Sequence, residues 1–381
     1  MRKIGQESKG GSFLVLKILI LALVSLIIIV GLVKFFNLER LFFKGPQTVV
    51  KLITDSGLKS DNGRVNILLL GTGGEGHEGP DLTDTIILAS VDKDGNDTAI
   101  ISLPRDLWSP YFNAKINHAY AYGQEKNGEG LELSQDTIRN LFDLPIHYTI
   151  RVDFDGFIKT VDLVEGLDIT VDYSFIDPKY PIPGKEDDLC GLTIENQDIN
   201  GVQVEVVKDA TGSATPLYEI TDMNNPFICR YENLKFEKGP LLLDGKTALK
   251  FVRSRHGSNG EGSDFARSVR QQKVLLAFRE KVFSSQTLTS PKTILELIST
   301  FDKSIDTNIP NEDVPLFVKL SQKADPAKIR MIVLDSDREE SVLKPGDPNN
   351  YQGQFVLEPK TGSWTDLAEY VQSEIFKLQE K

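Results

Sequence analysis

Acidic and basic side chains meet at one end of a predicted hairpin. The dipeptide Asp94-Gly95, between two strand-like runs, is a two-residue turn signal. A turn at that position places Asp84 opposite Arg105, with Asp106 one residue further along. Two carboxylates this close repel each other unless a cation lies between them, and hard oxygen ligands suit Mg²⁺. The pattern therefore indicates either a magnesium site or a strand-end salt bridge between Asp84 and Arg105.

A basic segment lies further along this acidic chain. Between Lys250 and Lys281 there are eight Lys or Arg residues and three acidic ones. The run Leu249–Arg253 reads as a strand, so Arg253 and Arg255 would alternate with their neighbours and point the same way. A local basic excess indicates a bound anion, and a solvated helix face is the alternative.

A long helix is predicted at 264–283, and polar residues lie in its first turns. Asp264 can cap it, Arg267 and Gln271 lie one turn apart on one face, and Arg270 lies beside them. Guanidinium groups bind phosphate bidentately, and a helix N-terminus favours anions. The arrangement favours a diphosphate ligand over surface ion pairs, because too few acids lie nearby to pair every arginine.

The glycine-rich loop Gly71–Gly79 follows a strand, as a phosphate loop would. It lacks the G-K-[ST] ending of a Walker A motif, and a strand rather than a helix is expected after it. We therefore do not expect a nucleotide site here. His77, within the loop, reads as an ordinary loop histidine.

Strand and helix patterns alternate along most of the chain, which is typical of an α/β or α+β sandwich. We expect a central mixed β-sheet flanked by helices, with a β-rich insertion at 175–238. The predicted strands are Val65–Leu70, Thr85–Val91, Thr98–Leu103, Leu167–Val171 and Ile329–Leu334. The predicted helices are Asn117–Tyr122, Ser134–Phe142 with Ser134 as N-cap, and Phe154–Val164 with Asp153 as N-cap.

The two cysteines, Cys190 and Cys229, both fall in this insertion. No CxxC motif or Cys/His cluster is present, which argues against a zinc site. Outside a cell the pair would form a disulfide closing a loop of about 40 residues, which would contribute about 3–4 kcal/mol. Two buried free thiols are the alternative.

The N-terminal part contains one long apolar run, Phe13–Val33, with 21 residues. That length spans a hydrocarbon core of about 30 Å, and no A-x-A-like cleavage site follows, so an uncleaved anchor is favoured over a signal peptide. Basic residues in the preceding tail, 1–12, place the N-terminus in the cytoplasm. Residues 34–63 would form a stalk, and 64–381 an extracytoplasmic domain.

The chain has 381 residues, of which 40% are hydrophobic, and it can bury a large core. Its formal net charge of −12 argues against general nucleic-acid binding.

Several short motifs, in this order, resemble the LytR–CpsA–Psr family from about Val65 to about Ile375. They are Asn66-Ile-Leu-Leu-Leu-Gly71, Thr83-Asp84-Thr85, Ser102-Leu-Pro-Arg105-Asp106, Lys115-Ile-Asn117 with Ala119-Tyr120, Leu243-Asp-Gly245-Lys-Thr-Ala248, Arg253-Ser-Arg255-His256, and Asp264-Phe265 through Arg267 to Arg270-Gln271. Each motif is short, and the combination is specific.

The resemblance implies an extracytoplasmic, Mg²⁺-dependent phosphotransferase of cell-wall assembly. Its donor would be a glycan linked to polyprenyl diphosphate, its acceptor peptidoglycan, and it would work at the membrane bilayer. Asp84 and Asp106 would hold the metal, and Lys115 would lie near the phosphates. The diphosphate would be held by Arg105, Arg253, Arg255, Arg267 and Gln271, and we add the neighbouring Arg270 to the substrate-binding residues.

The chain departs from the family pattern in the glycine-rich loop. Family members carry an Asp-Ser-Arg type element after the first strand and a second arginine before the Ser-Asp-Thr element. Here Gly73, Gly74 and Glu75 fill the first place, and no arginine lies between Gly71 and Asp84. A phosphate contact is therefore missing or replaced, by His77 or by backbone N–H groups of the loop. A polyprenyl-diphosphate phosphatase, or a non-catalytic sensor or scaffold that binds the lipid carrier, are the alternative functions.

Overall fold

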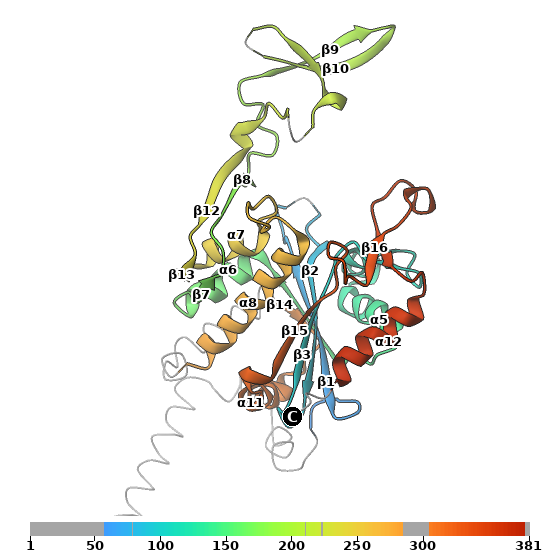
Figure 1. Ribbon diagram of the computed structural model, residues 1–381, viewed down its shortest axis with the longest axis vertical. Helices are drawn as coiled ribbons and strands as arrows, with labels where there is room; N and C mark the ends of the chain where they lie inside the picture. Colours follow the sequence, from blue (N-terminus) through green and yellow to red (C-terminus); the bar gives the residue numbers. More distant parts are fainter. Residues whose placement is uncertain (1–56, 78, 210, 222–223, 285–304, 378–381) are drawn as a thin grey trace, which may run out of the picture.

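The computed structural model describes residues 57–77, 79–209, 211–221, 224–284 and 305–377. A six-stranded mixed sheet runs through the domain in the order β14-β6-β1-β2-β3-β15 (Figure 1). Its strands are β1 (Arg64–Thr72), β2 (Thr83–Asp92), β3 (Thr98–Leu103), β6 (Tyr148–Asp153), β14 (Ile305–Thr307) and β15 (Ile329–Val333). The pairs β1/β6 and β3/β15 are parallel and the others antiparallel. Strand β3 is buried along its whole length, which explains its almost continuous apolar sequence.

Helices cover both faces of this sheet (Figure 1). On one face, α4 (Ala119–Asn127), α5 (Gly130–Phe142) and α12 (Trp364–Phe376) contribute side chains to the largest buried cluster, which includes Leu68, Leu88 and Ile101 of the sheet. On the other face lie α6 (Phe154–Leu163), α7 (Gly245–Arg253) and α8 (Asp264–Val282). The second cluster joins these helices to small sheets and takes no residue from the central sheet.

Apart from the strands within 175–238, the remaining described elements are short. They are β4 (Trp108–Ser109), β5 (Ala114–Lys115), β7 (Leu167–Val171), β13 (Gly239–Leu243), β16 (Leu343–Pro345), β17 (Leu357–Pro359), α11 (Val314–Lys323), and 3-10 turns at Ile116–His118, Leu217–Glu219, Ile228–Arg230, Asn311–Asp313, Pro326–Lys328 and Pro348–Tyr351.

The predicted hairpin register is confirmed, but its turn is not a two-residue turn. Strands β2 and β3 pair from Ile86 with Leu103 to Val91 with Thr98, the register that brings Asp84 and Arg105 together. The connection begins after Asp92, whose carboxylate accepts hydrogen bonds from two backbone N–H groups of the loop. The loop is longer than a two-residue turn and is held by hydrogen bonds to the Asp92 side chain, yet the strands keep the register that we predicted from a two-residue turn.

The predicted strand Leu249–Arg253 is wrong, because this segment is the end of helix α7. Asp244 caps that helix by accepting a hydrogen bond from the N–H of Thr247. Ala248 and Phe251, three residues apart, are buried on its inner face. The alternating pattern that suggested a strand covers only the last turn of the helix.

Three predicted caps have different outcomes. Asp153 accepts a bond from the N–H of Gly156 and caps α6, as predicted. Ser134 is not an N-cap: α5 begins at Gly130, and the Ser134 hydroxyl donates to the carbonyl oxygen of Gly130 inside the helix. The cap of α8 is Ser263, one residue before the predicted Asp264.

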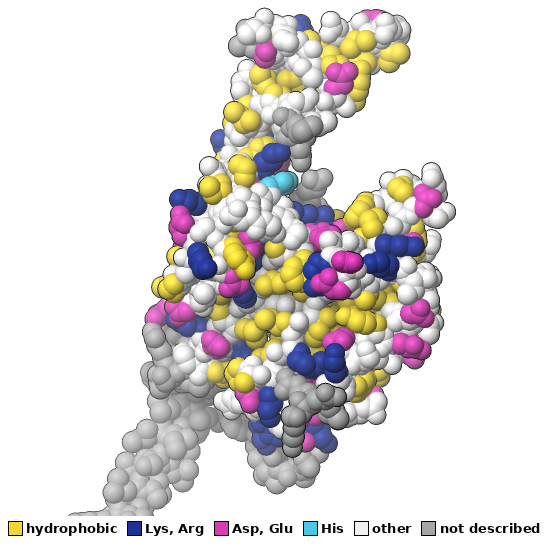
Figure 2. Space-filling model, viewed as in Figure 1, with side chains coloured by type: hydrophobic (Ala, Val, Ile, Leu, Met, Phe, Trp, Pro, Cys, Tyr) yellow, Lys and Arg dark blue, Asp and Glu magenta, His cyan; other side chains and the backbone are white. Residues whose placement is uncertain are grey.

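The segment 175–238 forms an arm that projects from the domain (Figures 1 and 2). Two of its strands, β8 (Phe175–Pro181) and β12 (Tyr231–Phe236), pair at the base. Its outer part is a three-stranded sheet of β9 (Thr193–Ile199), β10 (Val202–Lys208) and β11 (Ala214–Pro216). Strand β9 is mostly exposed, so the outer sheet gains little from burial.

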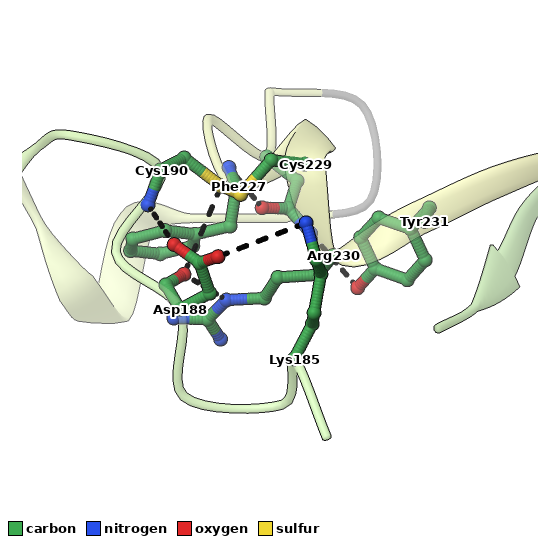
Figure 3. The surroundings of a disulfide bond; sticks show 8 residues. Lys185, Asp188, Cys190, Phe227, Cys229, Arg230 and Tyr231 are labelled. Carbon is green, nitrogen blue, oxygen red and sulfur yellow. Dashed lines mark hydrogen bonds and ion pairs between the residues drawn. A yellow bond between two sulfur atoms is a disulfide. The ribbon is translucent and has the colours of Figure 1, made fainter. Parts of the chain in front are cut away.

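The disulfide between Cys190 and Cys229 is confirmed (Figure 3). Beside it, the Arg230 guanidinium lies 4.0 Å from the centre of the Phe227 ring and donates to the carbonyl oxygen of Asp188. The disulfide and the cation–π contact between Arg230 and Phe227 hold the outgoing and returning segments of the arm together, just beyond the paired strands β8 and β12.

The predicted anchor, 13–33, and most of the predicted stalk lie outside the described residues. Among the residues that the structure describes, no helix is both long and apolar enough to cross a membrane.

The disulfide should stabilise the arm rather than the domain. Its cysteines are 39 residues apart, so closing that loop contributes about 3–4 kcal/mol to the ordered arm. In the double variant Cys190→Ser, Cys229→Ser we expect proteolysis inside the arm to accelerate about a hundredfold. Gel analysis with mass mapping of fragments measures this. Equal acceleration of cleavage in the central sheet would contradict it.

Candidate functional site

A cavity of about 740 Å³ lies between the central sheet and the layer formed by α6, α7 and α8. It exists because this helical layer packs on the small sheets and leaves side chains of the central sheet uncovered. Its apolar walls come from β1, β2, β6, β14 and the three helices, and include Leu69, Ile87, Ile150, Val152, Phe157, Val161, Leu249, Val252 and Ile305.

Helix α8 lines the cavity with one face that changes character along its length. Arg267 and Gln271 line it from the first turns, and Val274, Leu275 and Phe278 line it further on. These positions are spaced by three or four residues, so they share one face. The cavity is therefore cationic near the start of α8 and apolar towards its end.

Four arginines line the cationic end: Arg105, Arg253, Arg255 and Arg267. Asp84 lies 2.6 Å from Arg105 and 3.7 Å from Arg255, measured between nitrogen and oxygen. Asp264 lies 2.5 Å from Arg267. Asp106 also lies 3.5 Å from Arg105, but it pairs with Lys115 as well, so three carboxylates serve four cationic side chains.

This imbalance disturbs Arg255 most. Burial, together with the positive charges of Arg267 and Arg105, lowers the pKa of Arg255 to about 10 against the opposing effect of Asp84. Burial also lowers the pKa of Arg105, but Asp84 and Asp106 outweigh burial and leave it raised. The Arg255 end of the cavity is thus short of negative charge, which a phosphate would supply.

Arg253 reaches the cavity from the last turn of α7 rather than from a strand. Its guanidinium lies 4.3 Å from the centre of the Phe154 ring, a cation–π contact. Arg253 also hydrogen-bonds to Tyr180, whose pKa is raised chiefly by burial. Neither partner neutralises the guanidinium, so it too remains a cation available to an anion.

Asp106 lines a small pocket that shares Asp84, Arg105 and Gln271 with the large cavity. The Lys115 ammonium lies 2.8 Å from one Asp106 oxygen, and the Arg105 side chain lies 3.5 Å from the other. Asp84 and Asp106 thus meet at Arg105. Their hard oxygens fit Mg²⁺, which binds one or two protein carboxylates together with substrate phosphates.

Arg270 does not reach the cavity, although the sequence placed it among the substrate-binding residues. It is 2% exposed, and its guanidinium donates to the carbonyl oxygens of Phe251 and Ser254 and to the Glu261 carboxylate. Arg270, which lies on α8, thus caps the C-terminal carbonyl groups of α7 and joins the two helices. The physical reason is the helix phase: Arg270 faces α7, whereas Arg267 and Gln271 face the cavity.

The structure also brings in Asp177, Lys179 and Tyr180, which the sequence did not indicate, and His256, which belongs to a family motif but had no assigned role. Asp177 accepts hydrogen bonds from the Ser254 hydroxyl and from the backbone N–H groups of Arg255 and His256. Burial raises the pKa of Asp177, but these bonds and one from the Lys179 N–H outweigh it and leave the pKa lowered. Because Asp177 and Ser254 are 77 residues apart, no local pattern could have found this contact.

The glycine-rich loop contributes little to the cavity. Of its described residues, only Gly71 lines it. The His77 ring lies 5.3 Å from Phe154 in an edge contact and is not part of the lining. His77 therefore does not take the place of the missing arginine.

Solved structures share this mixed α/β fold. B. subtilis TagV gives a TM-score of 0.52 at 19% identity, covering 83% of this chain and 98% of that chain. The protein gbs0355 from Streptococcus agalactiae gives 0.53 at 20% identity, covering 87% and 92%. A structure of TagT bound to LIIa-WTA gives 0.50 at 20% identity, covering 83% and 93%.

Residues 44–360 match the model of the LytR_cpsA_psr family. The chain therefore belongs to the LytR–CpsA–Psr family. A named relative is the polyisoprenyl-teichoic acid–peptidoglycan teichoic acid transferase TagU of Bacillus cereus, 27% identical over 254 residues, which are 66% of this chain and 62% of that protein. TagU of Oceanobacillus iheyensis is 28% identical over 249 residues, 63% of this chain and 58% of that protein.

The substitution Arg255→Gln should stabilise the fold. The folded state lowers the pKa of Arg255, so at every pH below about 10 the charged side chain is disfavoured relative to the unfolded chain. We expect the melting temperature, measured in phosphate-free buffer, to rise by about 2–4 °C. Arg253→Gln is the matched control, because it loses the Phe154 contact and should not stabilise. A lower melting temperature for Arg255→Gln would contradict the charge imbalance.

Proposed function

We propose that this chain transfers a phosphate-linked glycopolymer from a polyprenyl-diphosphate carrier to a hydroxyl group of peptidoglycan. The observation that carries the proposal is the shape and charge of one cavity: under-neutralised arginines at one end and apolar walls at the other. A lipid diphosphate has the matching arrangement, with an anionic head and an apolar tail.

The relatives support this substrate class. TagU is a teichoic acid transferase by name, and TagT binds LIIa-WTA. For this chain we infer a wall polymer of the same broad kind, delivered through its terminal phosphate. The chain spans about 62% of the length of this TagU, so we propose the donor and the acceptor for this chain rather than take them from that protein.

The arginines would bind and orient the diphosphate. Arg255 and Arg267 lie at the charge-poor end of the cavity, and the Gln271 amide lies one turn further along α8. The acceptor hydroxyl would attack the glycan-side phosphorus, and the bond from that phosphorus to the polyprenyl phosphate would break. The arginines would stabilise the negative charge that the leaving phosphate gains.

Asp84 and Asp106 would hold Mg²⁺, which neutralises phosphate charge in transfers of this kind. The ammonium of Lys115 would keep the Asp106 carboxylate in place, since the two lie 2.8 Å apart. One of the two carboxylates would accept the proton of the acceptor hydroxyl.

We further propose that residues 13–33 anchor the chain in the cell membrane, with residues 1–12 in the cytoplasm and 64–381 outside it. The disulfide supports this location, since disulfides persist in oxidising compartments. An outside location places the cavity near lipid carriers and the wall.

The variant Asp106→Ala tests the transfer mechanism. We expect transfer of a labelled glycan from a lipid diphosphate to peptidoglycan to fall at least about a hundredfold, because one carboxylate ligand is lost. Donor binding should remain measurable, since the arginines are untouched. Removal of Mg²⁺ by a chelator should have the same effect on the wild type.

Three outcomes, from this assay and from an arginine variant, would contradict the proposal. Full activity of Asp106→Ala would remove the metal role. Release of free phosphate without an acceptor would favour a phosphatase. Retained biological function in Arg253→Gln, Arg255→Gln would favour a non-catalytic sensor or scaffold.

A further inference from the structure

The root of the arm is part of the cavity wall. Asp177, Lys179, Tyr180 and Pro181 of β8 and Tyr231 of β12 all line the cavity. Strands β8 and β12 leave the domain beside α7 (Figure 1). The insertion therefore builds one side of the site as well as the projecting sheet.

The contact between β8 and the arginine-bearing segment is closely fixed. Asp177 is 1% exposed and its carboxylate lies 2.7 Å from the Ser254 hydroxyl and 3.1 Å from the backbone nitrogen of Arg255. The backbone groups of Ile176 exchange two further hydrogen bonds with Ser258. Five hydrogen bonds, counting that of His256, thus join β8 to residues 254–258.

These contacts place the root at the cationic end. Asp177 binds the backbone of Arg255, and Tyr180 hydrogen-bonds to Arg253. Lys179 lies between these two anchors on β8 and is among the residues that line the same cavity. The apolar end lies in the other direction, towards Phe278 on α8. Lys179 therefore lies at the cationic end of the cavity, away from the apolar end that a lipid tail would fill.

We propose that Lys179 binds the glycan-side phosphate of the donor, so that the root of the insertion forms a head-group subsite. The inference rests on the proposed function and identifies a further binding residue for the same donor. Its ammonium would reach the phosphates from β8. The glycine-rich loop after β1 contributes to the described lining only Gly71, which carries no cation. A lysine suits this place because it binds phosphate as a point charge and needs no bidentate geometry.

Binding measurements on the full-length protein in detergent can test Lys179 directly. The probes are farnesyl diphosphate linked to one N-acetylglucosamine, which has both phosphates, and farnesyl monophosphate, which has only the lipid-side phosphate. For Lys179→Ala we expect the Kd for the sugar diphosphate to rise about tenfold to a hundredfold, the loss of one charge-assisted contact. The Kd for the monophosphate should change less than about threefold, because its phosphate lies at the arginines.

Two further variants make the test specific. Lys179→Arg keeps the positive charge and should recover most of the affinity for the sugar diphosphate. Lys235→Ala is the matched control: Lys235 lies on β12 of the same arm, pairs with Glu237 and is not part of the cavity lining. It should bind both probes as the wild type does.

The outcomes separate the two proposals. If Lys179→Ala binds the sugar diphosphate normally while Arg255→Gln does not, the lysine subsite is wrong and the proposed function stands. If Lys179→Ala weakens both probes equally, the glycan-side assignment is wrong. If the wild type binds neither probe, the proposed function itself is wrong.

Discussion

The shortage of negative charge at one end of a partly buried cavity is the constraint on which the site depends. Arg105, Arg255 and Arg267 are drawn together by elements that are far apart in sequence. Asp84 and Asp264 pair with them, and Asp106 is divided between Arg105 and Lys115. Burial weakens the solvation of each guanidinium, so their mutual repulsion is stronger here than at the surface. A fold tolerates such a cluster where an anion stabilises it, which is why the cavity indicates a phosphate ligand.

The architecture keeps this cluster in place through contacts outside the cavity. Arg270 fixes the end of α7 to α8 through backbone carbonyl oxygens. Gln272 donates from α8 to a hydroxyl and to carbonyl oxygens of β3 and β15. Asp177 holds the segment after α7 from the opposite side. Neighbouring polar residues of α8 thus have separate roles. Arg267 and Gln271 line the cavity, whereas Arg270 and Gln272 bind the helix to α7 and to the central sheet.

Local patterns in the sequence predicted the parts of the fold that local physics determines. The apolar runs predicted β3 to the residue and β1 and β2 to within two residues at each end, and the hairpin register brought Asp84 to Arg105 as expected. The prediction for 249–253 was wrong because a capped helix overrode a short alternating pattern. The assignment of Arg270 to the ligand failed for a different reason. A motif shows which arginines lie close together, but only their positions around the helix decide which of them face the cavity.

Long-range contacts could not be predicted in the same way. Asp177 meets Arg255 across the whole insertion, and no spacing rule relates a strand of the arm to the segment that follows α7. The cavity itself is also a tertiary feature, because it depends on a helical layer that does not rest flat on the central sheet. Family motifs indicated the arginines, whereas the wall formed by the arm became visible only when the chain was folded.

The length of the α8 face that lines the cavity bears on how much of the proposed lipid donor would lie inside the protein. From Arg267 to Phe278 the helix advances only about 16 Å, roughly half the thickness of a bilayer's hydrocarbon core. A long-chain carrier whose phosphate reached Arg267 would therefore keep most of its tail outside the protein. Such a carrier could be used while still dissolved in the membrane, and the distance between membrane and cavity would decide which carriers are long enough to reach.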